Sequence, residues 1–161
     1  MTLLPTLSPN AQAVQNLLEK AGLACKVIEF AESTRTAQEA ADRVGCSLGQ
    51  IVKSLIFQGV VSGKPILVLT SGANRVDEAQ LSQVAGEAIR RADPDFVRLT
   101  TGFAIGGVPP LGHARPMETY LDEDLLQYPS LWAAGGAPSA VFELTPAQLQ
   151  TLTGGTVRRV K

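Results

Sequence analysis

The 161-residue sequence has little of several residue types that mark particular classes of protein. It contains one histidine and two cysteines, Cys25 and Cys46. Spacing therefore offers no zinc-type cluster of Cys and His, and two cysteines do not make a disulfide framework. Two free thiols are typical of a protein from a reducing compartment. Aromatic residues form 5% of the chain, so the core must consist mainly of Val, Ile, Leu and Ala.

Excess positive charge is also missing. The formal net charge is −1 and the pI is about 5.8. Proteins that bind duplex DNA usually carry a basic face or stripe, and few phosphates could be neutralised here. No evident recognition helix is present either. The sequence therefore disfavours a DNA-binding regulator, although a small basic patch could still form locally.

Long apolar runs and leader features are lacking as well. The N-terminal "MTLLPTLSP" has no basic region before an apolar run, so it does not match a signal peptide. The longest uncharged stretch, 125–142, is interrupted by two prolines and two glycines, which argues against a membrane helix. With 45% hydrophobic and 18% charged residues, we expect one soluble, cytoplasmic domain over residues 1–161.

Helix and strand signals are interleaved along the chain. Capping residues followed by apolar residues at helical spacing predict helices that begin after Ser8, Thr36, Asp77, Asp93 and Thr145. Apolar segments predict strands within 25–30, 51–61, 64–72, 117–126, 131–136, 140–145 and 156–161. The two kinds of element do not alternate strictly. This order predicts a mixed α+β fold rather than a doubly wound one.

A lysine stands inside the apolar strand "IVKSLIF" at 51–57. Alternate strand residues share a face, so Lys53 shares its face with Ile51 and Leu55. An unpaired buried charge is costly, so Lys53 either reaches the surface along its apolar stem or opens into a cleft. Ser54 points the other way, and we expect it to be a core hydroxyl bonded to backbone. A Ser/Lys nucleophilic pair is therefore disfavoured.

The stretch "GFAIGGVPPLGH" at 102–113 combines four glycines, two prolines and the only histidine. Glycine lets a ligand approach the main chain, and proline stiffens a turn. Such a loop could offer the N–H groups of Gly106, Gly107 and Val108 to a carbonyl oxygen or oxyanion. A tight connection without a ligand is the alternative. His113 is an acid or base by its pKa class, or a hydrogen-bonded structural residue.

Together, five stretches resemble one family. They are "STRTAQEAA" (33–41), "GQIVKSLIF" (49–57), "ILVLTSGANRVD" (66–77), "TGFAIGGVPPLGH" (101–113) and "WAAGGAPSAVFELTPAQL" (132–149). They resemble the YbaK/ProRS-associated aminoacyl-tRNA editing domains, over about residues 10–160. The resemblance implies an α+β domain with a mixed, strongly curved β-sheet flanked by helices. It also implies hydrolysis of the ester in a mischarged tRNA.

The resemblance also implies site residues. Lys53 matches the family's lysine, and Gly106 to Pro110 match its G-x-x-x-P loop. Lys53 and Gly106 are therefore the expected catalytic residues, Lys53 positioning the terminal adenosine and its ester while loop amides hold the carbonyl. No metal or cofactor is implied. The expected substrate-binding residues are Thr36, Ser71, Gly107, Val108, Pro110, Gly112 and His113.

The substrate and partners stay open at this stage. The acceptor end of an aminoacyl-tRNA is the expected partner, and a synthetase such as prolyl-tRNA synthetase is a further candidate. Val108 and Pro109 stand where we expect polar residues in the cysteine-clearing branch, so alanine, serine, threonine and cysteine all remain candidates. The segment 61–70 could present an edge for homodimerisation. A non-catalytic tRNA- or synthetase-binding module is the main alternative to an enzyme.

Overall fold

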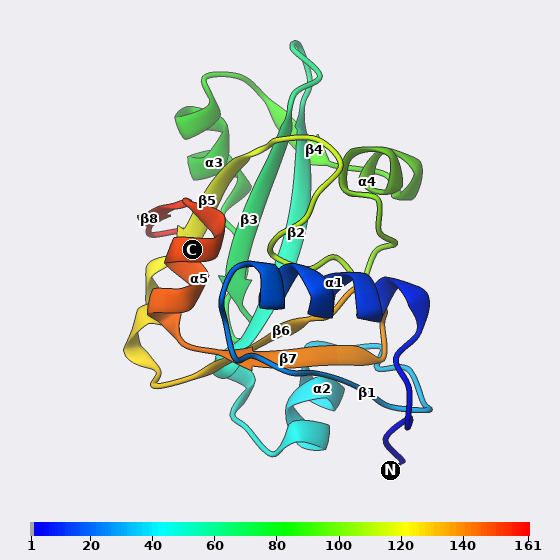
Figure 1. The fold of residues 1–161 in the computed structure, drawn as a ribbon. Coiled ribbons are helices and arrows are strands. Elements are labelled where there is room, and N and C mark those ends of the chain that lie inside the picture. Colours follow the sequence, from blue (N-terminus) through cyan, green and yellow to red (C-terminus); the bar gives the residue numbers. More distant parts are fainter. Residues whose placement is uncertain (1) are drawn as a thin grey trace.

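The computed structural model describes residues 2–161, which form one eight-stranded sheet with five α-helices around it (Figure 1). The strands are β1 (Val27–Glu29), β2 (Ile51–Gly59), β3 (Pro65–Ser71), β4 (Ile89–Arg91), β5 (Glu118–Asp122), β6 (Leu131–Ala134), β7 (Ala140–Leu144) and β8 (Thr156–Arg158). The helices are α1 (Pro9–Lys20), α2 (Ala37–Val44), α3 (Glu78–Ala85), α4 (Pro94–Thr101) and α5 (Pro146–Thr153). Two short 3-10 helices, η1 (Leu48–Gln50) and η2 (Glu123–Gln127), complete the described elements.

The sheet is mixed and curved, which confirms the fold class expected from the sequence. Its strand order is β1-β7-β6-β2-β3-β5-β8, and β4 pairs with the far end of β2. β2–β6, β3–β5 and β5–β8 are parallel pairs, and the others are antiparallel. In Figure 1, β7 runs across the view while β2 and β3 run upward, so the strands turn steeply along the sheet.

Local capping chemistry explains where the helices begin. Thr36 accepts a hydrogen bond from the backbone N–H of Glu39, and Asp77, Asp93 and Thr145 cap α3, α4 and α5 in the same way. The helix after Ser8 also forms, but the Ser8 hydroxyl does not cap it. That hydroxyl donates instead to the buried carboxylate of Glu29, 2.8 Å away.

Helices cover both faces of the sheet. α1, α4 and α5 pack on one face, where Val14, Val97 and Leu149 belong to the same apolar cluster as Val52 of the central strand. Figure 1 shows α1 crossing in front of the strands. The other face has two smaller apolar clusters, one under α3 around Phe57 and one under α2 that contains Ile51 and Ala41. Lys53 stands between these two clusters along β2, which leaves room for a polar side chain.

Strand β2 has a gap in its pairing. β3 follows it from Val52 to Gln58, but on its other side β6 pairs only with Ile51 and Val52. β4 pairs there only with residues 57–59. The main chain around Ser54 therefore has no strand neighbour on this side. This gap opens the sheet beside the loop that follows α4.

Strand β4 was not predicted from the sequence. Its three residues include two arginines and lie at an exposed edge, so they lack the apolar pattern that marks a strand. Within residues 2–161, no helix is both long and apolar enough to cross a membrane.

Candidate active site

A cavity of about 290 Å³ lies at the gap in β2. It is bordered by β2, β6 and β7, by the segment before α2, and by the loop after α4. Its lining residues are Thr34, Arg35, Thr36, Ala37, Ala40, Ile51, Val52, Lys53, Ser54, Leu55, Ile105, Gly106, Val108, Trp132, Ala133, Ala134, Pro138, Ala140 and Val141. The volume lies at the lower end of the range of small-molecule sites. The lining is mostly apolar, with a few polar groups that could orient a ligand.

Lys53 contributes a half-buried ammonium to this cavity. Its Nζ donates a hydrogen bond to the backbone carbonyl of Asn74, 2.8 Å away. Neither of the two salt bridges within residues 2–161 involves Lys53. Burial and the nearby guanidinium groups of Arg91 and Arg75 lower its pKa from 10.5, while the carboxylate of Asp122 acts in the opposite direction. The lysine therefore opens into a cleft rather than reaching free solvent.

The loop after α4 packs closely against the turn between β6 and β7. Gly106 adopts φ +90°, a conformation that favours glycine. The main chain of Gly107 lies so close to Ala137 that a Cβ there would come within 2.9 Å of Ala137 Cα. Val108 is buried in the main core. Backbone contact and one anchoring side chain thus fix the loop at the cavity.

Of the three loop amides expected to contact substrate, two remain free to donate. The N–H groups of Gly106 and Val108 have no acceptor among residues 2–161, and both residues line the cavity. Gly107 differs from the expectation, because its N–H donates to the carbonyl of Ala104 at 3.0 Å and closes a turn. The amide of Gly107 is therefore not available to a substrate. Of the three expected donors, the amides of Gly106 and Val108 remain for a carbonyl oxygen.

The only histidine supports the loop from behind. Nε2 of His113 lies 2.7 Å from the carbonyl oxygen of Pro109, and His113 does not line the cavity. Burial lowers its pKa, partly offset by this hydrogen bond, so the neutral ring that donates from Nε2 is favoured. The expected direct contact between His113 and substrate is not supported by this placement.

Ser71, Pro110 and Gly112 also lie away from the cavity lining. Ser71 is buried, and its hydroxyl donates to the carbonyl of Gly49 at 2.7 Å. Its expected contact with substrate is incompatible with this burial. Pro110 is buried within the loop, and Gly112 packs against the side chain of Leu17. These three residues shape the surroundings of the site instead.

Of the expected set, the structure brings Thr36, Lys53, Gly106 and Val108 together around the cavity. Thr36 lies at its mouth, where its hydroxyl oxygen already caps α2 through the N–H of Glu39. The hydroxyl hydrogen of Thr36 has no acceptor among residues 2–161. It therefore remains available to a ligand at the mouth.

Ser54 is a site residue that the sequence interpretation missed. The expectation of a core hydroxyl bonded to backbone is wrong: Ser54 is partly exposed, lines the cavity, and its hydroxyl makes no hydrogen bond within residues 2–161. An adjoining recess of about 60 Å³ shares Ser54, Ile105 and Val108 with the cavity and adds Arg91. The pairing gap of β2 exposes Ser54, and that gap depends on strands distant in sequence.

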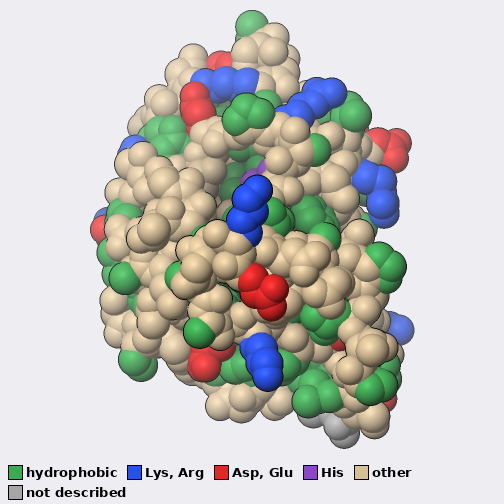
Figure 2. All heavy atoms as spheres, in the orientation of Figure 1, with side chains coloured by type: hydrophobic (Ala, Val, Ile, Leu, Met, Phe, Trp, Pro, Cys, Tyr) green, Lys and Arg blue, Asp and Glu red, His purple; other side chains and the backbone are tan. Residues whose placement is uncertain are grey.

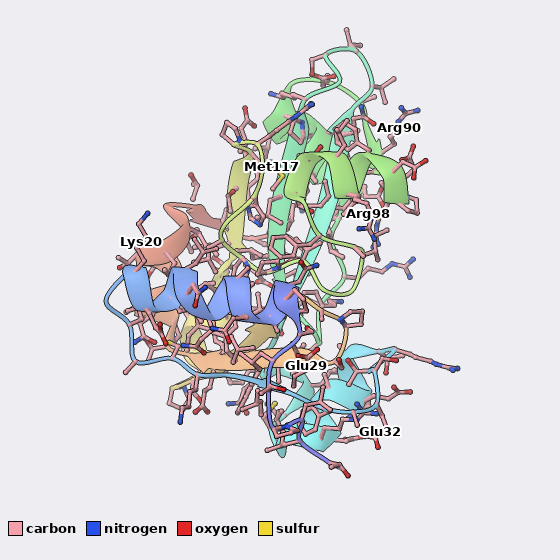
Figure 3. The ribbon with its side chains drawn as sticks, turned by 45° about the vertical axis from the view of Figure 1, so that its right-hand side comes forward. Lys20, Glu29, Glu32, Arg90, Arg98 and Met117 are labelled. Carbon is pink, nitrogen blue, oxygen red and sulfur yellow. The ribbon has the colours of Figure 1, made fainter. Side chains whose placement is uncertain are left out.

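The charges at the site are all positive. Arg35 and Lys53 line the cavity and Arg91 lines the recess, and neither lining contains a histidine or a carboxylate. In Figure 3, Arg90 and Arg98 lie on the right of the view, whereas Lys20 lies on the left, at the C-terminal end of α1. On the face seen in Figure 2, by contrast, positive and negative side chains are interspersed. Among residues 2–161, no group of three or more His, Cys, Asp or Glu is arranged to hold a metal.

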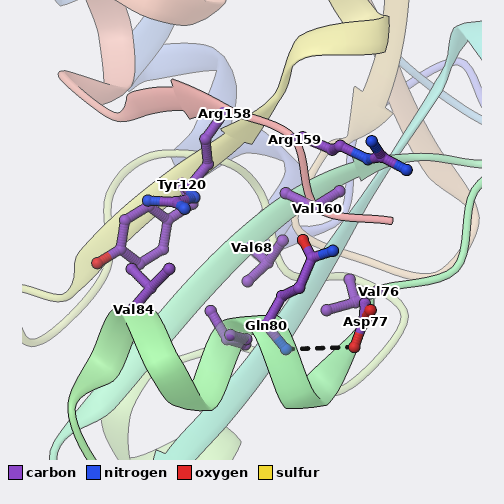
Figure 4. A pocket seen from close by; sticks show the side chains of 10 residues that line it. Val68, Val76, Asp77, Gln80, Val84, Tyr120, Arg158, Arg159 and Val160 are labelled. Atoms are coloured by element: carbon purple, nitrogen blue, oxygen red, sulfur yellow. Dashed lines mark hydrogen bonds between the residues drawn. The ribbon is translucent and has the colours of Figure 1, made fainter.

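A separate recess between α3 and β8 is too small for a ligand. Figure 4 shows it, with Tyr120, Arg158 and Val160 among the residues around it. Its volume is about 10 Å³, room for about one water molecule. The cavity beside Lys53 is much larger than this recess and contains the ammonium and the loop amides, so it is the candidate site.

Comparisons of sequence and structure relate the chain to known proteins. Residues 31–152 match the aminoacyl-tRNA editing domain family. The uncharacterized protein YwhH of Bacillus subtilis is 37% identical over 123 residues, which cover 76% of this chain and 78% of YwhH. The Enterococcus faecalis protein EbsC, named as a candidate deacylase of Cys-tRNA(Pro) and Cys-tRNA(Cys), is 28% identical over 86% of each chain.

A solved structure is similar over nearly the whole length. It is a crystal structure described as a candidate trans-editing enzyme for prolyl-tRNA synthetase, with 53% identity and a TM-score of 0.91. The match covers 97% of this chain and 99% of that one. The family match spans the cavity from Thr34 to Val141. The chain therefore belongs to the aminoacyl-tRNA editing domain family and is an enzyme of the hydrolase class that acts on aminoacyl-tRNA esters.

Proposed function

We propose that the protein hydrolyses, in trans, the ester of a mischarged tRNA that carries a small amino acid of the Ala, Ser, Thr or Cys class. One observation carries the proposal. A single small cavity brings an unpaired lysine together with two free backbone amides, and its walls otherwise consist largely of small or apolar side chains. This set of groups suits an aminoacyl ester at the end of an anionic polymer.

Lys53 positions the substrate in this proposal. A cation without a carboxylate partner can bind the electron-rich oxygens of the terminal adenosine and its ester. The bond from Nζ to the carbonyl of Asn74 uses one of the three ammonium hydrogens, so two remain for substrate. The positive charge also attracts the phosphates of the acceptor end, which suits a chain of nearly neutral net charge.

The loop stabilises the charge that develops during ester cleavage. When water attacks the ester carbon, the carbonyl oxygen becomes an oxyanion in a tetrahedral intermediate. Of the three expected donors, the N–H groups of Gly106 and Val108 can hold it, since the amide of Gly107 bonds within the loop. Fixed donors of this kind need no reorganisation during the reaction, and one can contribute about 10²- to 10³-fold in rate.

The water is activated without a histidine or a carboxylate from the cavity wall, because the lining contains neither. The neighbouring ribose 2′-hydroxyl of the substrate is the group that helps to activate it in our proposal. Replacing this hydroxyl by hydrogen, while keeping the ester on the 3′-oxygen, should slow enzymatic hydrolysis sharply. An unchanged rate would reject substrate assistance and leave the rest of the proposal standing.

The walls limit the size of the side chain but do not choose among small ones. Ile51, Val108 and Trp132 present apolar surface, on which one methylene changes discrimination by about 1–3 kcal/mol. The Ser54 hydroxyl adds one polar contact. The four small amino acids therefore stay together in the proposal, and a partnership with prolyl-tRNA synthetase would deliver the relevant mischarged tRNA in the cytoplasm.

The decisive experiment is a deacylation panel. Purified protein is incubated with Ala-, Ser-, Thr- and Cys-tRNA, each amino acid on tRNA-Pro and on its cognate tRNA. Lys53→Ala is compared with Lys64→Ala, a half-exposed lysine that pairs with Glu118 away from the cavity. We expect hydrolysis of one or two substrates, lost in Lys53→Ala and retained in Lys64→Ala.

Other outcomes of the panel are equally informative. Activity that survives Lys53→Ala would preserve the deacylase and remove the role of Lys53. No hydrolysis of any member, combined with tight binding of uncharged tRNA, would favour a non-catalytic binding module. The free loop amides beside the unpaired lysine favour the enzyme.

A further inference from the structure

The lysine of the proposed site is held by a turn. Lys53 Nζ donates to the main-chain carbonyl of Asn74, which lies in the turn between β3 and α3. This is the only hydrogen bond of the ammonium within residues 2–161. The position of Lys53 in the cavity therefore depends on the position of the Asn74 peptide group.

The Asn74 side chain anchors that turn to two carboxylates. Its amide nitrogen donates to Oδ2 of Asp122 at 2.8 Å and to Oδ2 of Asp124 at 2.7 Å. The two hydrogens of this amide thus link the turn to strand β5 and to the 3-10 helix η2 that follows it. Lys161 also bonds to Oδ2 of Asp124, at 2.7 Å.

Asp122 is the buried centre of this arrangement. It is 1% exposed, and its Oδ2 also accepts from the hydroxyl of Thr70 and the backbone N–H of Ser71, each at 3.0 Å. Its Oδ1 accepts from the N–H of Asp124 at 2.9 Å. In all four bonds the carboxylate oxygens of Asp122 are the acceptors. Its partners come from β3, the Asn74 turn and η2.

We propose that Asn74 and Asp122 are positioning residues for the proposed hydrolysis, which hold the Lys53 ammonium at the cavity through the backbone carbonyl of Asn74. This inference rests on the proposed role of Lys53 and adds two residues that do not line the cavity. The turn is also tied at its end, where the N–H of Asp77 donates to the carbonyl of Val160 at 2.7 Å.

The same arrangement balances the charge on Lys53. Arg91 from β4 and Arg75 from the turn disfavour the ammonium, and burial does so as well. Asp122 from β5 favours it, as the only carboxylate among these influences on its pKa. Removing the negative charge of Asp122 should therefore lower the pKa of Lys53 further. A buried carboxylate far from Lys53 would leave this pKa unchanged.

The test uses two variants and one matched control. Asn74→Ala removes the anchor but keeps the backbone carbonyl, and Asp122→Asn removes the negative charge. Glu29→Gln is the control, because Glu29 is a second buried carboxylate, 4% exposed, that accepts from Ser8 on the far edge of the sheet. The full chain carries lysine labelled with ¹³C at Cε, and the Lys53 signal is assigned by its loss in Lys53→Ala.

We expect Asp122→Asn to shift the NMR titration of Lys53 to lower pH, and Glu29→Gln to leave it in place. Asn74→Ala should lower kcat on the substrate found in the panel about 10- to 100-fold, the loss expected when a reacting group is misplaced by about 1 Å. KM should change less. Because Asn74 is partly exposed, its variant keeps the test available if Asp122→Asn does not fold.

The inference is overturned if both variants lose stability but keep the Lys53 titration and kcat of the unaltered protein. Its failure differs from failure of the proposed function. A protein that hydrolyses nothing would refute the function, while the titration would still test the link between Asp122 and Lys53. Activity that depends on Lys53 but not on Asn74 or Asp122 would refute the inference alone.

Discussion

Gly107→Ala tests whether the contact between the loop and the β6–β7 turn positions the free amides. A methyl group at residue 107 would lie 2.9 Å from Ala137 Cα and 3.0 Å from its carbonyl carbon and nitrogen. Favourable carbon–carbon contacts lie near 3.5–4.0 Å. One of the two backbone segments must therefore move by roughly 0.5 Å or more. A backbone neighbour cannot rotate away as a side chain would.

The magnitude follows from the cost of overpacking. Adding a methyl group to a closely packed site typically costs about 1–3 kcal/mol. The turn from the N–H of Gly107 to the carbonyl of Ala104 resists relaxation, so the displacement should carry Gly106 and Val108 with it. Misplacing these donors by about 1 Å would lower kcat up to about 100-fold.

The assay combines urea unfolding with steady-state deacylation. Gly154→Ala serves as the control: Gly154 follows α5 with φ +61° and has no heavy atom within 4 Å of the added Cβ. It should lose about 1–2 kcal/mol from the left-handed backbone alone and keep its kcat. If Gly107→Ala matches the unaltered protein in both stability and kcat, close packing against Ala137 does not set the loop.

Three further predictions concern charge, pH and the core. Arg91→Ala should raise KM and reduce the slope of log KM against log salt concentration by about one. Arg90→Ala should have a smaller effect on both, because the Arg90 side chain bonds to Gln58. The rate of enzymatic hydrolysis, corrected for spontaneous ester loss, should fall as the pH rises and Lys53 loses its proton. Because the pKa of Lys53 is lowered, this fall should come at a pH below 10.5. A rate that rises over that range would make the neutral amine the active form. Phe142→Ala should lower the free energy of unfolding by about 3–5 kcal/mol in urea, because Phe142 is fully buried; a loss below 1 kcal/mol would contradict this.

The sequence predicts the helices well because their signals are local. Thr36 with Glu39, and Asp93 with Pro94, carry the start of a helix within four residues, and both helices begin there. Ser8 shows the limit of this reasoning. A helix does follow it, but its hydroxyl bonds to Glu29, which lies 21 residues later and becomes a neighbour only after folding.

The site is predicted only in part because its geometry is not local. Lys53 stands out in the sequence as a charge within an apolar strand, and it does line the cavity. Ser54 gives no such signal, since its exposure depends on where β6 ends and β4 begins beside β2. The amide of Gly107 is likewise lost to a turn that composition alone does not indicate.

The route of the chain through the cavity has a consequence for synthesis on the ribosome. The lining begins at Thr34 and is completed only by Val141 of β7, the late strand with which β1 pairs. Pairing between segments so distant in sequence is slow to form. A nascent chain therefore has no enclosed site until residue 141 has left the exit tunnel. We expect this hydrolase to acquire activity only after residue 141 has emerged and β7 can pair.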